Sequence, residues 1–309
     1  MKGISIIICS YNSSSRIEAT LEHIANQELY GLRCEVVLVD NNCSDDTLAV
    51  AQKKWKDCGE PFELRIVEEK EPGLSFARKT GVRAAEGETL IFCDDDNWLE
   101  KTYLQNVVLG FLRYPDAGIL GAWSDASFEP AQLIPEWFEQ IKGSMAVGGK
   151  PDNDCLVQEV WGAGMAILKI VASEIFLTNN VLSGRKGDSL VSGEDSEICE
   201  KARNLGYKIY KLTSLKYTHF ITGNRLTWKY VTRLNKGFGF SSMENSFHSY
   251  NKSMFLLILG YSFYSLKTIL KNPQGFVFYI SKTSNKVSAL KFYGIEGAWD
   301  FVRGNLRNN

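Results

Sequence analysis

Three consecutive aspartates, Asp94, Asp95 and Asp96, follow an apolar run with the sequence LIFC. Three adjacent carboxylates repel one another, so a chain that keeps them needs a compensating charge. A helix N-terminus favours negative side chains, and this explains one or two of the three. A divalent cation explains all three better, because Mg²⁺ and Mn²⁺ prefer carboxylate oxygens supplemented by substrate phosphates.

A second acidic pair, Glu194 and Asp195, opens a segment whose pattern predicts a helix from about residue 194 to 205. Such a pair can be an ordinary helix start, or it can supply a general base for proton transfer. His219 is one of only three histidines, and a lone histidine is usually structural. Arg225, Lys229 and Arg233 are spaced four apart, which predicts one helix face, either solvated or facing a diphosphate.

Alternating apolar strands and amphipathic helices surround these residues. The pattern predicts strands over residues 4–9, 34–40, 62–68, 88–93 and 117–123, and helices over 15–27, 73–87 and 98–115. A further helix is predicted within residues 41–56, after a cap at Ser44 or Asp45. Strand–helix alternation is typical of an α/β fold with a mostly parallel sheet. The segment 125–160 lacks periodicity, which indicates an active-site loop.

In such sheets ligands bind at the carboxyl ends of the strands. The residues that follow successive strands are rich in oxygen ligands, and include Ser10, Tyr11, Asn12, Asp40, Asn41, Asn42 and the three aspartates. One edge of the sheet is therefore predicted to hold the site.

Several other classes of protein are excluded by the sequence. No glycine-rich dinucleotide loop follows the first strand, the stretch GAGMAI at residue 162 is misplaced for one, and no Walker loop occurs. The seven cysteines form no CxxC pair, which favours a reducing compartment over a disulfide or zinc framework. The N-terminal apolar run is too short for a signal peptide.

Four blocks together resemble the family 2 glycosyltransferases: SIIICSYN, EVVLVDNNCSDDT, EPGLSFARKTGVRAAEGETLIFCDDD and SGEDSEICEKARNLGYKIY. The resemblance covers roughly residues 3 to 240. It implies a GT-A fold, with a Rossmann-like, mostly parallel sheet flanked by helices. It also implies a catalytic domain over 1–220, with a donor part to about 123 and an acceptor part from 124, followed by a helical extension over 221–309.

The resemblance also implies roles for the residues named above. Asp94 and Asp96 would be the DxD residues that hold Mn²⁺ or Mg²⁺, with Asp95 facing the ribose or sugar. Asp195 would be the base, supported by Glu194, and His219 would lie near the metal or pyrophosphate. The remaining donor-binding residues would be Ser10, Tyr11, Asn12, Asp40, Asn42, Arg78 and Arg225. Asn41 departs from the family pattern, which commonly has an acidic residue there.

The implied reaction is sugar transfer from a nucleotide donor to an acceptor hydroxyl by a metal-dependent enzyme of the hexosyltransferase type. A single base without a carboxylate nucleophile implies one displacement, with inversion at the anomeric carbon. UDP-sugars are favoured over GDP- or dTDP-sugars, and no nucleic acid is involved. The acceptor would be a glycan or a lipid-linked acceptor, in surface polysaccharide or glycan synthesis. The alternatives are a haloacid-dehalogenase-like metal-dependent phosphohydrolase and a non-catalytic sugar-nucleotide binding module.

The C-terminal segment differs in charge from the rest. Residues 251 to 309 hold eight basic and two acidic residues, a balance of +6, so that residues 1 to 250 carry −7 of the total −1. The run from Met254 to Leu270 is apolar but short for a spanning helix, and it contains Lys267. We expect either a buried helix or an interfacial one on an anionic membrane surface, with the protein cytoplasmic or peripheral at the inner face of the cell membrane.

Overall fold

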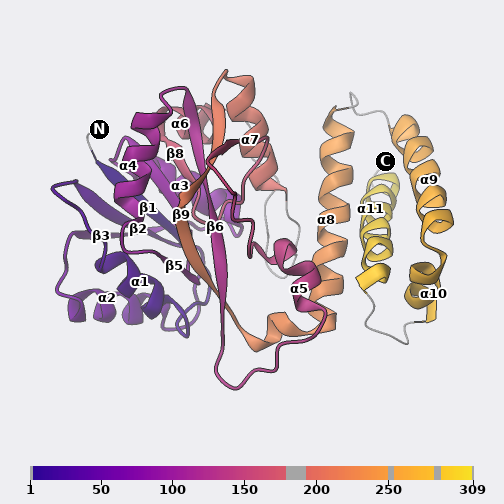
Figure 1. Ribbon diagram of the computed structural model, residues 1–309, viewed down its shortest axis with the longest axis horizontal. Helices are drawn as coiled ribbons and strands as arrows, with labels where there is room; N and C mark the ends of the chain where they lie inside the picture. The colour runs from indigo at the N-terminus through magenta and orange to yellow at the C-terminus, as the bar shows by residue number, and fades with distance from the viewer. Residues whose placement is uncertain (1–2, 179–192, 250–253, 282–286, 308–309) are drawn as a thin grey trace. The chain divides into compact units, whose positions relative to one another are not determined.

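The computed structural model describes residues 3–178, 193–249, 254–281 and 287–307 (Figure 1). The chain divides into two compact units. The first comprises, within these residues, 3–129, 143–178 and 194–221, and the second comprises 130–142, 193, 222–249, 254–281 and 287–307.

The first unit is built on a nine-stranded, mostly parallel sheet. Its strands are β1 (Ile4–Ser10), β2 (Cys34–Asp40), β3 (Glu63–Glu68), β4 (Thr89–Asp94), β5 (Asn97–Leu99), β6 (Ala117–Phe128), β7 (Cys155–Leu156), β8 (Ala166–Leu168) and β9 (Lys208–Ile221). The order is β3-β2-β1-β4-β8-β6-β9-β5, with β7 paired to β9. β1, β2, β3 and β4 are parallel neighbours, whereas β8 runs antiparallel to β4 and β6. The predicted α/β class is confirmed.

Helices cover both faces of this sheet. α1 (Ile17–Ala25), α2 (Thr47–Asp57) and α4 (Tyr103–Arg113) share one buried cluster with Ile4, Ile6 and Ile8 of β1. α3 (Leu74–Ala84), α6 (Lys169–Ser173) and α7 (Glu194–Asn204) share the opposite cluster with Ile7. Burial on both faces explains why β1 is apolar at almost every position.

Three predicted elements differ from the structure. The helix predicted over 98–115 starts only at Tyr103, because Asn97–Leu99 form a strand with β9. The fifth strand, predicted to end at Trp123, continues to Phe128, because it pairs with β9 along residues 216–221. Arg225 lies in a 3₁₀ turn, η3 (Gly223–Leu226), and the extended Thr227 separates it from α8 (Trp228–Ser249). The prediction of one helix face shared by Arg225 with Lys229 and Arg233 is therefore wrong.

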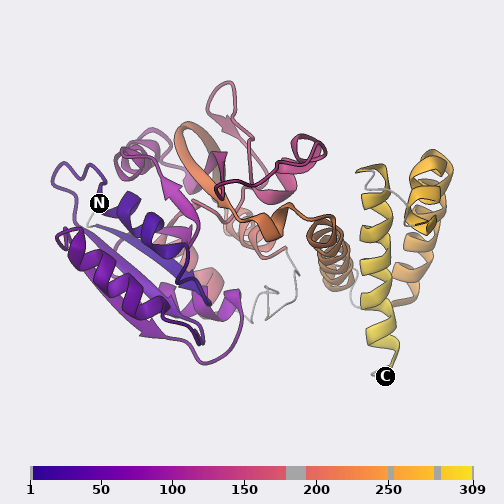
Figure 2. The same ribbon diagram turned by 90° about the horizontal axis from the view of Figure 1, so that it is seen from below.

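The second unit is helical. Besides α8 it contains α5 (Phe138–Ile141), α9 (Met254–Lys271), α10 (Pro273–Ser281) and α11 (Leu290–Arg307). α8 and α11 pack closely: a Cβ added to Gly239 would lie 1.8 Å from the carbonyl oxygen of Gly294, so only glycine fits. Figure 2 shows α11 running beside the α9–α10 pair. None of the helices in the described ranges is both long and apolar enough to traverse a bilayer.

Candidate active site

The acidic run lies at the carboxyl edge of the sheet. Asp94 is the last residue of β4, and Asp95 and Asp96 form the buried turn that precedes β5. Burial, followed by the neighbouring Asp96 carboxylate, raises the pKa of Asp94, while Arg78 opposes the rise. The same two causes raise the pKa of Asp95 to about 6. The site therefore disfavours three negative charges at once unless a cation is present.

Arg16 compensates one of the three charges. Its Nε lies 2.7 Å from Asp95 Oδ1 and its second terminal nitrogen 2.8 Å from Oδ2, which is a bidentate pair. Arg16 also donates to the Asn12 carbonyl at 3.2 Å, which ties the loop after β1 to the acidic turn. Arg16 is not predicted from the sequence, because nothing in its local pattern distinguishes it from a solvated arginine before a helix.

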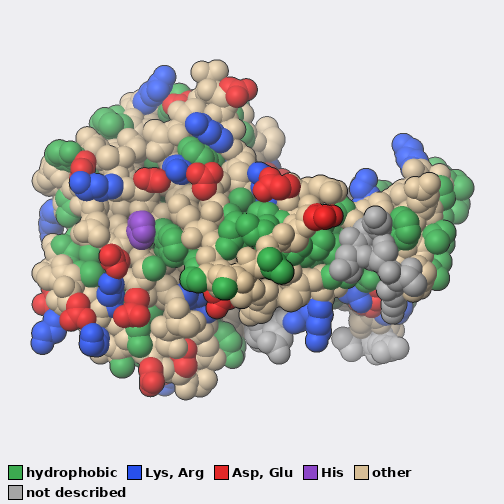
Figure 3. Space-filling view, turned by 60° about the horizontal axis from the view of Figure 1, so that its bottom comes forward, with side chains coloured by type: hydrophobic (Ala, Val, Ile, Leu, Met, Phe, Trp, Pro, Cys, Tyr) green, Lys and Arg blue, Asp and Glu red, His purple; other side chains and the backbone are tan. Residues whose placement is uncertain are grey.

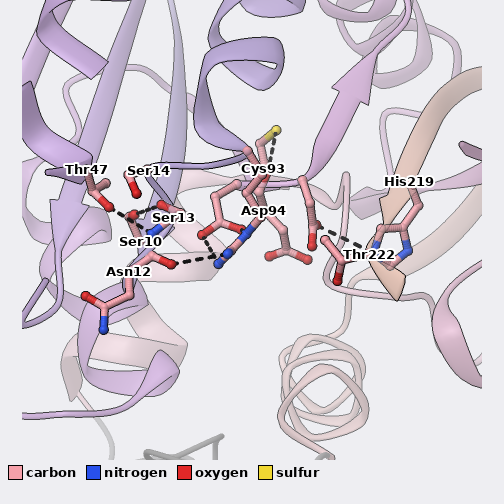
Figure 4. Close-up of polar contacts among 12 residues, drawn as sticks. Ser10, Asn12, Ser13, Ser14, Thr47, Cys93, Asp94, His219 and Thr222 are labelled. Atoms are coloured by element: carbon pink, nitrogen blue, oxygen red, sulfur yellow. Dashed lines mark hydrogen bonds and ion pairs between the residues drawn. The ribbon is translucent and has the colours of Figure 1, made fainter. Parts of the chain in front are cut away.

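His219 reaches the acidic turn because β9 pairs with β5 and places it opposite Asn97. Its Nδ1 lies 2.8 Å from the carbonyl oxygen of Met145. A carbonyl can only accept, so we assign a proton to Nδ1, and Nε2 lies 3.5 Å from Asp96 Oδ1. A backbone carbonyl of this kind is a common partner of metal-ligating histidines. Figure 4 shows Asp94 between the loop of Ser10 and Asn12 and the ring of His219.

The donors present suit a hard divalent cation only in part. Across the part of the chain that the structure describes, no three His, Cys, Asp or Glu side chains come close enough together to hold an ion by themselves. Carboxylates of Asp94 and Asp96 and the imidazole of His219 could supply some ligands, and a phosphate-bearing substrate would supply the others, as Mg²⁺ and Mn²⁺ sites commonly require.

The acidic pair opens α7 beside a buried arginine from α3. The terminal nitrogen Nη1 of Arg78 lies 2.9 Å from Asp195 Oδ1 and 3.4 Å from Glu194 Oε1, and its guanidinium stacks 5.0 Å from the Phe92 ring centre. Burial alone would lower the pKa of Arg78, but the carboxylates of Glu194 and Asp195 raise it, so this cation persists at any working pH. The Asp195 carboxylate also adds to the upward pKa shift of Asp94. The acidic run and the acidic pair therefore belong to one site.

Glu194 and Asp195 have different environments. Only 4% of the Glu194 side chain is exposed against 38% for Asp195. Burial, with a further contribution from Asp195, raises the pKa of Glu194 to about 7 despite the opposing Arg78. Asp195 is thus the accessible carboxylate and Glu194 the enclosed one.

Gly162 backs directly onto the Arg78–Asp195 pair. A Cβ at this position would lie 2.2 Å from Asp195 Oδ1 and 2.4 Å from an Arg78 terminal nitrogen, so any side chain would displace the pair. From the sequence, the glycines at 162 and 164 indicate only a misplaced dinucleotide loop.

The loops after β1 and β2 hold the other predicted donor contacts. Ser10 is buried, whereas Tyr11 is 54% exposed and available to a ligand. Asn12 accepts from the Ser44 amide at 2.8 Å and Asp40 from the Cys43 amide at 2.9 Å, so both side chains shape these loops.

Two asparagine side chains form hydrogen bonds with the loop that leads into α3. Asn41 is buried, donates to the carbonyls of Glu69 and Glu71 at 3.0 and 2.7 Å, and accepts from Gly73 at 2.9 Å. Asn42, with a φ of +66°, donates to the carbonyl of Glu69 at 3.2 Å. An amide serves both directions at position 41, which a carboxylate could not. Arg225 belongs to the second unit, and its role remains a prediction.

Comparison with known proteins shows which protein family and which glycosyltransferases this chain resembles. The model of "Glycosyl transferase family 2" matches residues 5–158. The cholesterol galactosyltransferase of Borreliella burgdorferi is 32% identical over 102 residues, which are 33% of this chain and 27% of that protein. The uncharacterized glycosyltransferase EpsJ of Bacillus subtilis is 29% identical over 151 residues, 45% of this chain and 42% of that protein.

Among solved structures, the mannosyltransferase PcManGT of Pyrobaculum calidifontis, in complex with GDP-Man and Mn²⁺, is similar with a TM-score of 0.56 at 19% identity. The similarity covers 79% of this chain and 64% of that one, and it shows a shared fold. The matches to the two curated relatives span between about a quarter and two fifths of their lengths.

Proposed function

Because this chain belongs to glycosyl transferase family 2, we propose that it transfers a sugar from a nucleotide-sugar donor to an acceptor hydroxyl. The observation that supports this best is the convergence of two acidic groups on one arginine. Arg78 contacts Asp195 at 2.9 Å, and its charge also acts on the half-buried Asp94 at the end of β4. A donor-binding carboxylate and a proton acceptor are thus held within one site.

Asp195 serves as the base in this proposal. Its partly exposed carboxylate takes the acceptor hydroxyl proton while the hydroxyl oxygen bonds to the anomeric carbon and the bond to the diphosphate oxygen breaks. Arg78 orients the carboxylate, and Glu194, enclosed behind it, supports that arrangement. In this reaction no carboxylate acts as a nucleophile. A single displacement by the acceptor oxygen therefore inverts the anomeric configuration.

A divalent cation, Mn²⁺ or Mg²⁺, would be held by Asp94, Asp96 and the Nε2 atom of His219. When bound, it would neutralise charge on the diphosphate leaving group. The position of His219 supports this assignment, since Nδ1 lies 2.8 Å from the Met145 carbonyl oxygen and Nε2 lies 3.5 Å from Asp96 Oδ1. The Mn²⁺ in the similar mannosyltransferase structure supports the choice of cation.

The donor would lie against the loops of Ser10, Tyr11, Asn12, Asp40 and Asn42, with Asp95 and Arg225 as further donor contacts. A UDP-sugar is favoured, with GDP- or dTDP-sugars as the other candidates. The acceptor would be a glycan or a lipid-linked glycan, and residues 1–220 would form the catalytic domain. The basic extension, 221–309, would hold the enzyme peripherally at the cytoplasmic face of a membrane.

The test is calorimetric titration of UDP-, GDP- and dTDP-sugars with Mn²⁺, Mg²⁺ or a chelator, combined with an assay of diphosphate release. We expect one donor class to bind in a metal-dependent manner, and Asp96→Asn to abolish the metal dependence. Asp125→Asn, an exposed aspartate on β6, is the matched control. Equal affinity with chelator would refute the metal role.

The alternatives give different outcomes in the same assays. Donor binding without diphosphate release under any acceptor would indicate a binding module. Phosphate release from a simple phosphomonoester, lost in Asp94→Asn, would indicate a phosphohydrolase. The relatives named above are glycosyltransferases, which favours neither alternative.

A further inference from the structure

One face of α9 exposes a continuous row of large apolar side chains. Five residues spaced four, four, three and four apart are between 56% and 74% exposed: Phe255, Leu259, Phe263, Leu266 and Leu270. This spacing puts them on one face of the helix. We call these five residues the α9 stripe. Val277 and Ile280 of α10 are exposed to a similar degree.

The α9 stripe is not the face that the second unit uses for its core. Leu257, Ile258 and Tyr261 face inward and pack with a cluster that includes Phe301 of α11. The Tyr261 ring meets Trp299 of α11 at 6.3 Å. The helix is therefore apolar on two sides, although its own unit requires only one. An exposed apolar row of this length marks a binding surface.

The charge around the stripe is one-sided. From Met254 to Ser281, α9 and α10 contain Lys267 and Lys271 and no acidic residue. Lys267 follows Phe263 by four residues and Lys271 follows Lys267 by four, so the two exposed lysines form a row along one shoulder of the stripe. The two acidic residues of α11, Glu296 and Asp300, are each paired with a cation, Lys236 and Arg303.

We infer that the α9 stripe is the docking surface of this enzyme for an anionic lipid bilayer. The helix would lie in the plane of the interface, with the stripe in the acyl boundary and the lysine row against the headgroup phosphates. Figure 3 shows several hydrophobic side chains at the surface of the C-terminal helices, at the right of the view. At 18 residues with a lysine inside, α9 suits this orientation and not a crossing.

A second copy of the chain is the less favourable occupant. In a two-fold pairing of α9 with itself, the same patch faces itself, so the two lysine rows would approach each other without any carboxylate on α9 or α10 between them. A bilayer containing anionic lipid meets both the apolar and the basic part of the surface.

The lipid-linked acceptor belongs to the proposed function, and a docked α9 stripe would bring the enzyme to the membrane that holds such an acceptor. The stripe consists of residues other than those of the catalytic site, so membrane binding is tested separately from catalysis. The experiment is co-sedimentation of the full chain with vesicles of phosphatidylcholine, alone or with phosphatidylglycerol. The stripe variant is Leu259→Ser/Phe263→Ser/Leu266→Ser, and the lysine variant is Lys267→Glu/Lys271→Glu. The matched control is Leu109→Ser/Leu112→Ser, two exposed leucines on α4 of the other unit.

We expect the unaltered chain and the control to pellet with phosphatidylglycerol vesicles. The stripe variant should lose at least about tenfold in partition to either lipid, and the lysine variant about tenfold to the anionic lipid alone. Circular dichroism confirms that each variant is folded. Asp195→Asn should bind vesicles like the unaltered chain, so a failure of the proposed catalysis leaves this result intact.

Two outcomes would overturn the inference. One is a stripe variant that binds vesicles like the unaltered chain. The other is an unaltered chain that ignores vesicles but forms a dimer, seen by light scattering, that the stripe variant loses.

Discussion

Replacement of the buried Glu194 by glutamine should stabilise the protein at alkaline pH while impairing turnover. Glutamine has the shape of the protonated carboxyl group but cannot ionise. The pKa of Glu194 is raised to about 7 from an ordinary 4.5, mainly by burial. That difference corresponds to about 3 kcal/mol in favour of the protonated side chain in the folded state.

The pH window follows from the direction of this shift. The folded protein binds the Glu194 proton more tightly than the unfolded chain does. The contribution to the free energy of unfolding is therefore fully present below about pH 4.5 and is lost as the pH rises through about 7. Glu194→Gln should match the unaltered protein near pH 4.5 and exceed it by up to about 3 kcal/mol near pH 8.

The assay is urea unfolding followed by circular dichroism, repeated between pH 5 and 8. Glu200→Gln, an exposed position on the same helix, is the control and should leave the pH dependence unchanged. A Glu194→Gln protein that is less stable than the unaltered one at pH 8 would refute the reasoning. It would mean that Glu194 is ionised there and that its 3.4 Å contact with Arg78 outweighs the effect of burial.

Three further predictions concern the same site. Asp195→Asn should lower turnover by roughly 10²-fold or more with little change in donor affinity, measured by steady-state kinetics and calorimetry; near-normal turnover would place the base elsewhere. Arg16→Met should lower the free energy of unfolding at pH 8 by about 3 kcal/mol, because Asp95 loses its bidentate partner, and adding Asp95→Asn should recover most of that loss; equal stability of the single and double variants would contradict the pairing. Gly162→Ala should reduce turnover at least about tenfold without unfolding the chain, because its methyl group displaces the Arg78–Asp195 pair; unaltered kinetics would show that the pair can shift freely.

Local sequence patterns could predict the part of the fold whose neighbours are close in the chain. β1 to β4 and the helices between them follow the apolar periodicity, and the helix predicted from Glu194 is α7. β5 could not be predicted in this way. Trp98 stacks between His23 at 5.5 Å and Phe220 at 5.3 Å, and these partners lie 75 residues before and 122 residues after it. Tertiary contact decides the conformation of such a segment.

The site shows the same division. Asp94, Asp96 and Asp195 could be proposed because carboxylates at strand and helix ends carry a chemical signal of their own. Arg16 and Gly162 carry none: each matters only through a partner that is distant in sequence, Asp95 for the first and the Arg78–Asp195 pair for the second.

The pairing of β5 with β9 also has a consequence for biosynthesis. Residues 97–99 lie opposite residues 217–219. His219 can therefore reach the acidic turn only after more than a hundred further residues have been synthesised. At translation rates of about 5–20 residues per second, this delay is on the order of ten seconds. β8, which covers the open edge of β4, emerges earlier but still well after the aspartates. Until β8 is made, the nascent chain exposes one unpaired edge of the largely apolar β4, and we expect it to be most susceptible to misassembly during this interval.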